Sequence, residues 1–576
     1  MDLRPSLLAF SFCFLFSFAS LSGQTIPLVK IADASDADRL NPLTNVSATG
    51  SYVGEYLFFS LLGTDKKNGE FVPLLAEALP KVSEEGKVYT YTLHSQARFN
   101  SGKKISADDV VFSMKLIKNP YVGNDNNRSQ YADVMSAKAI SDRTVEIRLA
   151  HPSLQGLRAS GEFPVFSEEI MDPEGIMSQY TFEQLGNRKL LDRDQLAVLS
   201  TLAKQVNAFG NSFQSYDPNA VSGPYLLAGW KRKEQISLVA NKKFWGRKLG
   251  STPNQFFAQN VDRIEVHIFD EESEWRSAVF SKGFDLLASM PPGLFSELSS
   301  IPSLASKYHF HSQPGPSYEY IGMNLKGKER GRKALFREAQ VRRAIAHLVE
   351  VDLLLENTHF GLGQRMAAEY PTYSPDFRNE DLELLDYDVS KAKALLASAG
   401  WEDSDENGLC DKVVEGEDVE FVGEIIYNEN APQRKVIAEN LFKNGREAGL
   451  LLTVTGLPWE DYLARLRSGE YDLAVGAWVS DPNEDSYRQI WHSSNWGNGS
   501  NFGGFIDPQT DALIESYDRS VEMEERKVLA RIIQARIYEA QPYVFLWSRD
   551  QNIVIKKGTE AEIFPMRPGF WVGSWE

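Results

Sequence analysis

The sequence predicts an α/β fold with mixed sheets, because segments with helical and with strand periodicity alternate along the whole chain. The chain has 576 residues, of which 42% are hydrophobic and 24% charged. This composition excludes disordered, collagen-like and disulfide-scaffold proteins. At roughly 100–200 residues per domain, the length predicts about three to five domains with large cores. The sequence contains no tandem repeat and no low-complexity tract.

The N-terminal segment is predicted to be a secretory signal peptide. An apolar run, residues 7–21 (LLAFSFCFLFSFASL), follows Arg4 and ends in small and polar residues, so we expect cleavage near residues 22–23. The alternative is an uncleaved anchor helix, but the run is shorter than the roughly 20 apolar residues that a spanning helix needs. No lipoprotein motif surrounds Cys13, so we expect no lipid anchor there. Because cleavage removes Cys13, the mature chain should keep only Cys410 and have no internal disulfide.

The first elements after this segment are short. Residues 27–32 and 88–93 (VYTYTL) are predicted strands, and the latter alternates with period two. Residues 53–62 are a predicted apolar helix. A second helix over residues 106–114 begins with a serine cap followed by two aspartates, which suit the positive end of a helix. The paired acids are therefore interpreted as a helix start and not as catalytic groups.

The middle of the chain changes from polar helical patterns to a connecting segment and then back to strand patterns. Residues 151–220 have polar helical patches, and the Gly-, Asn- and Ser-rich stretch 207–222 is typical of a connection. Strand patterns resume at residues 223–230, 235–239 and 263–269.

The C-terminal part predicts further alternation. Helical patterns cover residues 341–349, 390–399, 434–448 and 524–538. Residues 471–479 (YDLAVGAWV) have the apolar, β-branched composition of a buried strand that ends at a loop.

The net charge of −18 and the pI near 5.1 argue against a nucleic-acid partner, because phosphate binding needs clustered Lys and Arg. No His-Glu-x-x-His motif, Gly-x-Ser-x-Gly elbow or Walker loop occurs. The sequence offers no convincing catalytic centre, and this absence favours a binding protein over an enzyme.

Two segments resemble metal sites without completing one. His309 and His311 lie on one face of a possible strand but lack a third ligand nearby. Residues 403–408 (DSDENG) are similar to the start of a calcium loop, yet Val414 stands where a bidentate Glu belongs. A solvated turn is the preferred interpretation, and we predict neither metal nor cofactor.

Aromatic residues are abundant, with 11 Trp, 22 Tyr and 33 Phe. Most should be core residues. Four tryptophans lie near the acidic loop 481–485 in the sequence, namely Trp459, Trp478, Trp491 and Trp496. They fit either an aromatic wall for a cationic, partly apolar ligand or an acidic loop over a packed cluster, and the sequence does not separate the two.

A series of short motifs occurs in a fixed order along the chain. They are residues 40–42, 57–62, 73–79, 89–93, 99–113, 223–225, 241–245, 341–344, 388–401, 469–473, 478–481 and 507–514. Residues 99–113 (FNSGKKISADDVVFS) are the strongest local match. In this order the motifs resemble those of the family 5 extracellular solute-binding proteins, the oligopeptide and dipeptide receptors of ABC importers.

The resemblance implies a two-lobed, periplasmic-binding-protein-like (class II) clamshell with mixed sheets, two crossing strands and an extra small domain inserted in the N-terminal lobe. It predicts about three domains wound discontinuously. The predicted bounds are 1–23 for the signal peptide; 24–60, 215–320 and 545–576 for lobe I; 61–214 for the inserted domain; and 321–544 for lobe II.

The resemblance also implies a function. The expected protein is an exported, monomeric receptor of the periplasm or cell envelope that encloses a peptide between its lobes and hands it to an ABC-type permease. The ligand backbone is held as an added strand, so main-chain hydrogen bonds give affinity without sequence choice.

The family's site residues map onto two regions. Asp481 in Trp-x-x-Asp matches the carboxylate that pairs with the peptide ammonium, because a desolvated cation needs a charged partner. The other implied ligand-binding residues are the pocket-wall Trp459, Trp478 of the same motif, Ala477 and Val479 of the ligand-pairing strand, and the opposing Val46, Ser47 and Ala48.

Some positions depart from the family pattern. Val475 stands where some peptide binders carry a basic residue for the ligand carboxylate, and residues 181–212 are longer than usual. Peptide length and carboxylate recognition therefore stay open. The alternatives are an oligosaccharide, metal chelate or haem bound by the same fold, and a hydrolase that uses Glu484 and Asp485. Asp481 favours a ligand with a free amine.

Overall fold

The computed structural model describes residues 26–123, 128, 131–152, 155–249, 253–370, 375–414, 416–479, 487–497, 499–520 and 522–575. The predicted signal peptide, with Cys13, lies outside the described residues. Cys410 is buried as a free thiol. Within the described residues, no helix has both the length and the apolar character that crossing a membrane requires.

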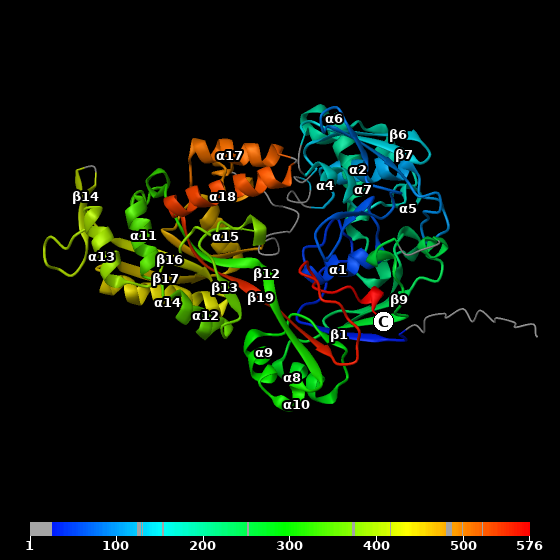
Figure 1. Cartoon of the computed structure of the whole chain (residues 1–576). Coiled ribbons are helices and arrows are strands. Elements are labelled where there is room, and N and C mark those ends of the chain that lie inside the picture. Colours follow the sequence, from blue (N-terminus) through cyan, green and yellow to red (C-terminus); the bar gives the residue numbers. More distant parts are fainter. Residues whose placement is uncertain are drawn as a thin grey trace, which may run out of the picture.

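The α/β prediction is confirmed: one 11-stranded mixed sheet runs through two lobes (Figure 1). Its order is β17 (Leu451–Leu457), β16 (Val422–Asn428), β18 (Leu473–Val479), β12 (Tyr308–Met323), β19 (Tyr543–Lys556), β11 (Leu286–Leu287), β1 (Val29–Asp33), β10 (Arg263–Ile268), β9 (Gln235–Ala240) and β8 (Tyr225–Lys231), with β13 (Gly363–Arg365) also paired to β19. Strands β8 to β11 and β1 form the first lobe, and β16 to β18 form the second.

The two lobes are joined by β12 and β19, which are the longest strands of the sheet at 16 and 14 residues. They pair antiparallel from Tyr308 with Lys556 to Gly322 with Tyr543. The register is interrupted between Pro314 and Tyr318, where prolines cannot donate to the ladder. We call β12 and β19 the crossing strands.

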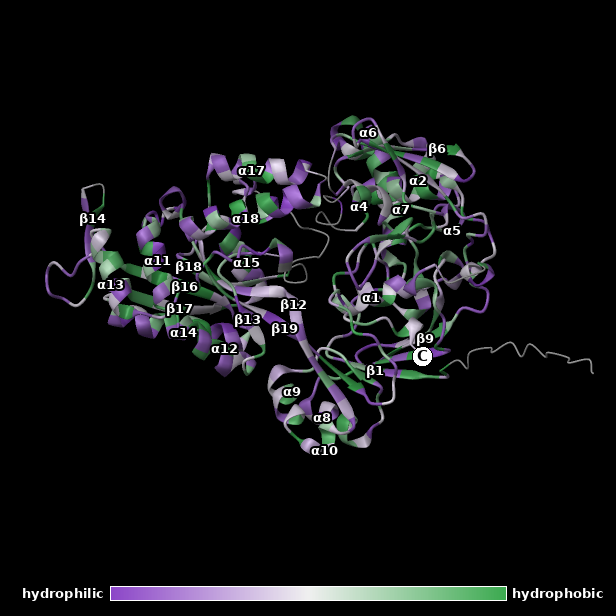
Figure 2. Cartoon of the chain, in the orientation of Figure 1, coloured by the Kyte–Doolittle hydropathy of each residue, from purple (hydrophilic) through white to green (hydrophobic). Residues whose placement is uncertain are grey.

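The second lobe covers both faces of its strands with helices. One face packs on α11 (Ala339–His347), α12 (Val351–His359), α13 (Val389–Ser398) and α14 (Pro432–Glu447). The other packs on α16 (Arg488–Trp491), α17 (Pro508–Arg519) and α18 (Met523–Ala540), while α15 (Trp459–Ser468) contacts β16. Buried on both sides, β16 and β18 are apolar over most of their length, as Figure 2 shows.

The first lobe packs α1 (Ala48–Leu57) on one side of its strands. A separate core on the other side involves α8 (Glu272–Ser281), α9 (Pro292–Ser299) and α10 (Pro302–Ala305). Ser47 begins α1 as its cap and accepts a hydrogen bond from the Gly50 amide at 3.1 Å.

A smaller sheet lies next to the first lobe, in the order β4 (Lys81–Ser83), β5 (Val88–Thr92), β7 (Thr144–Leu149) and β6 (Val134–Ser141). It packs with α2 (Ala107–Lys118), α4 (Gly156–Gly161), α5 (Glu168–Met171), α6 (Phe182–Gly186) and α7 (Arg193–Ala208), and a hairpin of β2 (Leu62–Thr64) and β3 (Phe71–Pro73) adjoins it. These elements fall in the predicted insertion 61–214 but share one continuous core with the first lobe. The exact domain bounds stay a prediction.

The predicted helix start at Ser106 is confirmed and its acids are structural. The Ser106 hydroxyl accepts from the Asp109 amide, and the Asp109 carboxylate accepts from the Ser106 amide. Buried Asp109 also pairs with Lys103 at 3.0 Å.

Candidate ligand-binding cleft

A cavity of about 720 Å³ lies at the crossing strands, between the two lobes. The first lobe contributes residues 33–35, 46, 48, 51, 52, 55, 288–292, 566–568 and 570, and the predicted insertion beside it contributes residues 64, 66, 158 and 162. The crossing strands contribute 315–317 and 549–552, and the second lobe contributes Thr358, His359, Gln433 and Val479. This volume is in the range of small-molecule sites.

The first-lobe wall includes two of the predicted residues. Val46 and Ala48 line the cavity, and Val46 is 76% exposed. Ser47 lies between them but turns to cap α1, and its amide donates to Asp38 at 3.0 Å. The segment is therefore fixed by Asp38, although only its flanking residues face the cavity.

The second-lobe wall is the end of β18. Val479 lines the cavity and is 54% exposed, while Ala477 pairs with Glu319 of β12. Strand β16 pairs with β18 only through Leu473, Ala474 and Val475. Among the described residues, no strand covers that edge of β18 from residue 476 to 479.

The four tryptophans do not form one wall, and none lines the cavity. Trp478 stacks between Tyr320 and Phe502, with ring centroids 6.2 and 6.0 Å away, and Trp491 is buried. Trp496 lies against Arg330. Trp459 begins α15, stacks on Tyr462 and is 45% exposed.

Asp481, the acidic residue of the predicted ligand-binding site, lies outside the described residues, as do Glu484 and Asp485 of the hydrolase alternative. The contact of Asp481 with a ligand therefore stays a prediction, as do the ligand contacts of the seven other predicted ligand-binding residues.

Comparison with known proteins agrees with this architecture. Residues 70–500, most of the chain, match the model of the bacterial extracellular solute-binding proteins, family 5.

The chain belongs to this family.

Known relatives cover most of this solute-binding protein. A dipeptide-binding protein of Pseudomonas aeruginosa is 21% identical over 505 residues, which are 84% of this chain and 83% of the relative. Heme-binding protein A of Haemophilus influenzae is 23% identical over 512 residues, 85% and 81% of the two chains.

Among solved structures, the oligopeptide-binding protein AppA of Bacillus subtilis, in complex with a nonapeptide, superposes with a TM-score of 0.69. The match has 18% identity and covers 96% of this solute-binding protein and 99% of AppA. This likeness shows a shared fold, which is the predicted two-lobed architecture.

Several charged groups of the cleft are already compensated. Lys66 pairs with Glu55 at 2.8 Å, and Arg158 pairs with Glu162 at 2.9 Å. Asp33 is buried and accepts from the Tyr52 hydroxyl at 3.1 Å. Burial raises the pKa of Asp33 to about 6, and its hydrogen bonds oppose the shift only in part.

Under the crossing strands, Glu319 of β12 is completely buried between two arginines. Its carboxylate lies 3.5 Å from Nε of Arg549 and 3.7 Å from Nε of Arg434. Among the described residues, neither carboxylate oxygen and neither Nε has a hydrogen-bond partner. Burial raises the pKa of Glu319, and the two arginines only reduce the shift. We call these three residues the Glu319 cluster.

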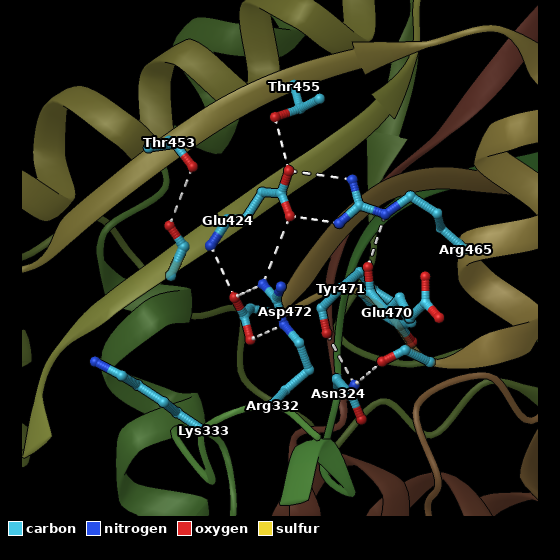
Figure 3. A network of polar contacts seen from close by, with 12 residues as sticks. Asn324, Arg332, Lys333, Glu424, Thr453, Thr455, Arg465, Glu470, Tyr471 and Asp472 are labelled. Carbon is cyan, nitrogen blue, oxygen red and sulfur yellow. Dashed lines mark hydrogen bonds and ion pairs between the residues drawn. The ribbon is translucent and has the colours of Figure 1, made fainter. Parts of the chain in front are cut away.

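A second acid–arginine group, the Glu424 cluster, holds α15 on the sheet (Figure 3). Glu424 of β16 accepts hydrogen bonds from Arg465 of α15 and from the Thr455 hydroxyl of β17, the latter at 2.8 Å. Arg332 lies 3.5 Å from Glu424 and pairs with Asp472, which accepts from the Glu424 amide. This network fixes the helix that carries Trp459.

The two metal-like segments lie apart from the cavity lining. Asp403 and Asp405, in an exposed turn, and the half-buried Asp411, at the start of β14 (Asp411–Val414), bring carboxylate oxygens within 4.8 Å of one another. Asp405 accepts from the Asn407 amide, as in an Asx turn, and Asp403 accepts from the Gly408 amide. The rings of His309 and His311 are 6.0 Å apart.

Sequence reasoning missed Asp33 and Arg549, which line the cavity, and Glu319 and Arg434, which lie beside Arg549. No motif marks them, because each is a single polar residue in an otherwise structural segment. The one available signal was an acid within the largely apolar and aromatic residues 317–323 (SYEYIGM), since a buried charge requires a partner.

Proposed function

We propose that this protein is a receptor that captures peptides between its lobes and delivers them to the permease of an ABC importer. The observation that carries the proposal is a cavity lined by both lobes and both crossing strands. A ligand that contacts both lobes at once would favour their closed arrangement over the open one. Relatives support the ligand class: one is named a dipeptide-binding protein, and AppA is solved with a nonapeptide.

The uncovered edge of β18 supports the mode of binding. An extended peptide has the same spacing of amide and carbonyl groups as a strand, so it can pair with residues 476–479. Ala477 and Val479 would then hold the ligand backbone, with Val46, Ser47 and Ala48 opposite.

Trp459 fits as a wall of this site. It follows β17 directly, and β16, β17 and β18 run parallel, so their carboxyl ends meet at one edge of the sheet. Its exposed ring therefore stands at the edge where β18 ends. Trp478 lies on β18 itself and would support the site through its stack with Tyr320.

We propose further that residues 1–23 direct export and that the mature monomer acts in the periplasm or cell envelope without binding nucleic acid. The family description as extracellular supports this location. N-terminal sequencing of the secreted protein tests it: a start near residue 24 supports cleavage, and an intact N-terminus supports an anchor.

Native mass spectrometry of the protein as purified tests the ligand class. A mixture of short peptides that survives gentle ionisation is expected. A single glycan, haem or metal chelate would contradict the proposal. Peptides recovered shortened after long incubation would indicate hydrolysis by the acids at 484 and 485.

Asp481 is proposed to pair with the peptide ammonium. Asp481→Ala should weaken binding by about 2–5 kcal/mol, because the desolvated ammonium loses its charged partner. Calorimetry with a free and an N-acetylated peptide provides the control. The acetylated peptide should bind the unsubstituted protein and the variant equally weakly; an unchanged affinity of the free peptide would reject the assignment.

A further inference from the structure

A second cavity, of about 270 Å³, adjoins the ligand cleft between α1 of the first lobe and the predicted insertion. We call it the side chamber. It shares six lining residues with the cleft, and we call these the rim: Ser51, Glu55, Thr64, Lys66, Arg158 and Glu162. Because the same side chains line both spaces, the side chamber meets the cleft along the rim.

Helix α1 separates the two spaces. Residues 48, 51, 52 and 55 line the cleft, whereas residues 51, 54, 55 and 58 line the side chamber. Both sets have the three- and four-residue spacing of a helix face, so they lie on neighbouring faces of one helix. The segment proposed to lie beside the ligand backbone, residues 46–48, leads directly into this helix.

Gly54 lines the side chamber beside open space. It lies inside α1 and is buried. Apart from its own helix backbone and chain neighbours, no described heavy atom would lie within 4 Å of a Cβ atom added there. At Gly50 a Cβ atom would lie 2.5 Å from the Arg39 carbonyl oxygen, and at Gly63 it would lie 2.8 Å from a Leu74 methyl group. Packing therefore requires glycine at 50 and 63 but not at 54, where glycine weakens the helix and leaves the chamber open.

The side chamber is mainly apolar beyond a neutral rim. Lys66 pairs with Glu55 at 2.8 Å. Arg158 pairs with Glu162 at 2.9 Å. These charges cancel, and no other described residue of the chamber lining is charged. Besides Asn45, Ser60 and two glycines, the rest of the lining is apolar and consists of Pro42, Phe58, Leu74, Phe163, Pro164 and Phe256. Such walls favour an uncharged group, because a charged one would lose its hydration without gaining a partner.

The size of the side chamber fits an aromatic ring. An apolar cavity of about 150 Å³ already binds benzene. A space of about 270 Å³ therefore has room for the ring of a phenylalanine or tryptophan side chain. The three phenylalanines of the lining also offer such a ring edge-to-face contacts.

We propose that the side chamber binds one large apolar side chain of the bound peptide, with aromatic side chains preferred. This inference rests on the proposed function and deepens it. Main-chain pairing gives affinity whatever the ligand sequence, whereas the side chamber adds a choice of side chain at one ligand position. An extended ligand beside residues 46–48 directs alternate side chains to the same face, and one of these passes Ser51 and Glu55 into the chamber.

Calorimetry with substituted alanine peptides tests the assignment. Each position of trialanine and of pentaalanine is replaced in turn by phenylalanine. At one position the phenylalanine peptide should bind at least about tenfold more tightly than its alanine parent, because the ring is removed from water. Glutamate and lysine at that position should give no such gain.

Substitution of Gly54 fills the side chamber from α1. Gly54→Leu should reduce the preference for phenylalanine to near one, because the new side chain occupies the open space. Gly54→Met should have the same effect with a more adaptable side chain, and circular dichroism checks the folding of both. Gly186→Leu is the matched control and should keep the preference. Gly186 is exposed at the end of α6 and lines neither space, and a Cβ atom there also has no described neighbour within 4 Å.

The outcomes separate the two proposals. Equal affinity for alanine and phenylalanine at every position overturns the role of the side chamber and leaves peptide capture standing. A preference that survives in either folded Gly54 variant also overturns that role, because the ring then binds elsewhere. An equal gain with glutamate or lysine overturns the apolar class. If no peptide of the set binds, peptide capture fails and the role of the side chamber fails with it.

Discussion

The Glu424 and Glu319 clusters contain the same residue types in opposite states. Each places one glutamate beside two arginines. Glu424 is hydrogen-bonded to Arg465 and Thr455, and these contacts hold its pKa below the ordinary value despite partial burial. The Glu319 carboxylate has no hydrogen bond to any residue that the structure describes, and burial raises its pKa.

The difference in hydrogen bonding shows which of the two clusters can serve as a structural anchor and which has donors left for another partner. Completed hydrogen bonds make the Glu424 cluster a structural anchor that fixes α15 to β16. In the Glu319 cluster the arginines have unused donors, and one of them faces the cleft. Position decides between the two outcomes, because only the Glu319 cluster includes residues of the crossing strands, Glu319 of β12 and Arg549 of β19, while its Arg434 belongs to α14.

The largest expected difference is in stability. Glu424→Gln should lower the free energy of unfolding by about 3 kcal/mol, because it breaks a partly buried charged network. Glu319→Gln should lower it by more, about 3–5 kcal/mol, because it leaves two guanidinium groups facing each other without a carboxylate between them. Urea unfolding of both variants measures this; a loss below about 1 kcal/mol in the Glu319 variant would mean that its carboxylate adds no net stability to the cluster.

A smaller difference in the free energy of unfolding is expected when one hydroxyl group is removed from each cluster's surroundings. Thr455→Val removes a hydrogen bond to Glu424 and should cost about 1 kcal/mol. Ser548→Ala, next to Arg549, removes a buried hydroxyl that has no partner in the described part of the chain, and should be neutral or slightly stabilising. Thermal unfolding of the pair gives the comparison, and a clear loss in the Ser548 variant would reveal a hydrogen bond at the Glu319 cluster.

The finest test is the pH dependence of stability. The pKa of Glu424 is lowered, so its contribution should be lost as pH falls below 4.5, the ordinary value, through its folded pKa. The pKa of Glu319 is raised, so the folded protein should lose stability as pH rises from 4.5 through its folded pKa.

Unfolding midpoints at several pH values, each relative to the matching Gln variant, should therefore slope in opposite directions. With rising pH, the advantage of the unsubstituted protein should grow against E424Q and shrink against E319Q. Parallel slopes would contradict the contrast between the clusters.

Much of the fold follows from local patterns in the sequence. Period-two alternation correctly predicts β5, and the serine cap correctly predicts α2. The 16-residue helix α7 is not predicted as one helix, because only Leu199, Leu202, Ala203 and Val206 are buried and its apolar stripe is narrow.

The longest strand, β12, is predicted only in part, as a possible strand at His309 and His311. Its central residues include Pro314, Gly315 and Pro316, which normally exclude a strand, and the structure accommodates them at an interruption of the register. The Glu319 cluster depends on that interrupted pairing. Its three residues are distant in sequence, so no local pattern could bring them together, whereas Val46, Ala48 and Val479 lie in segments with motifs beside them.

The interrupted register has a mechanical consequence. Both lobes belong to one hydrogen-bonded sheet, so rotation of one lobe against the other must twist the two crossing strands together. The paired strands therefore resist the rotation and allow it in few directions. Strain should concentrate over residues 314–318, where the ladder is already broken. At Gly315 a Cβ atom would lie 2.6 Å from the Arg549 carbonyl oxygen. Only glycine therefore allows the two crossing strands to approach this closely where the ladder is broken.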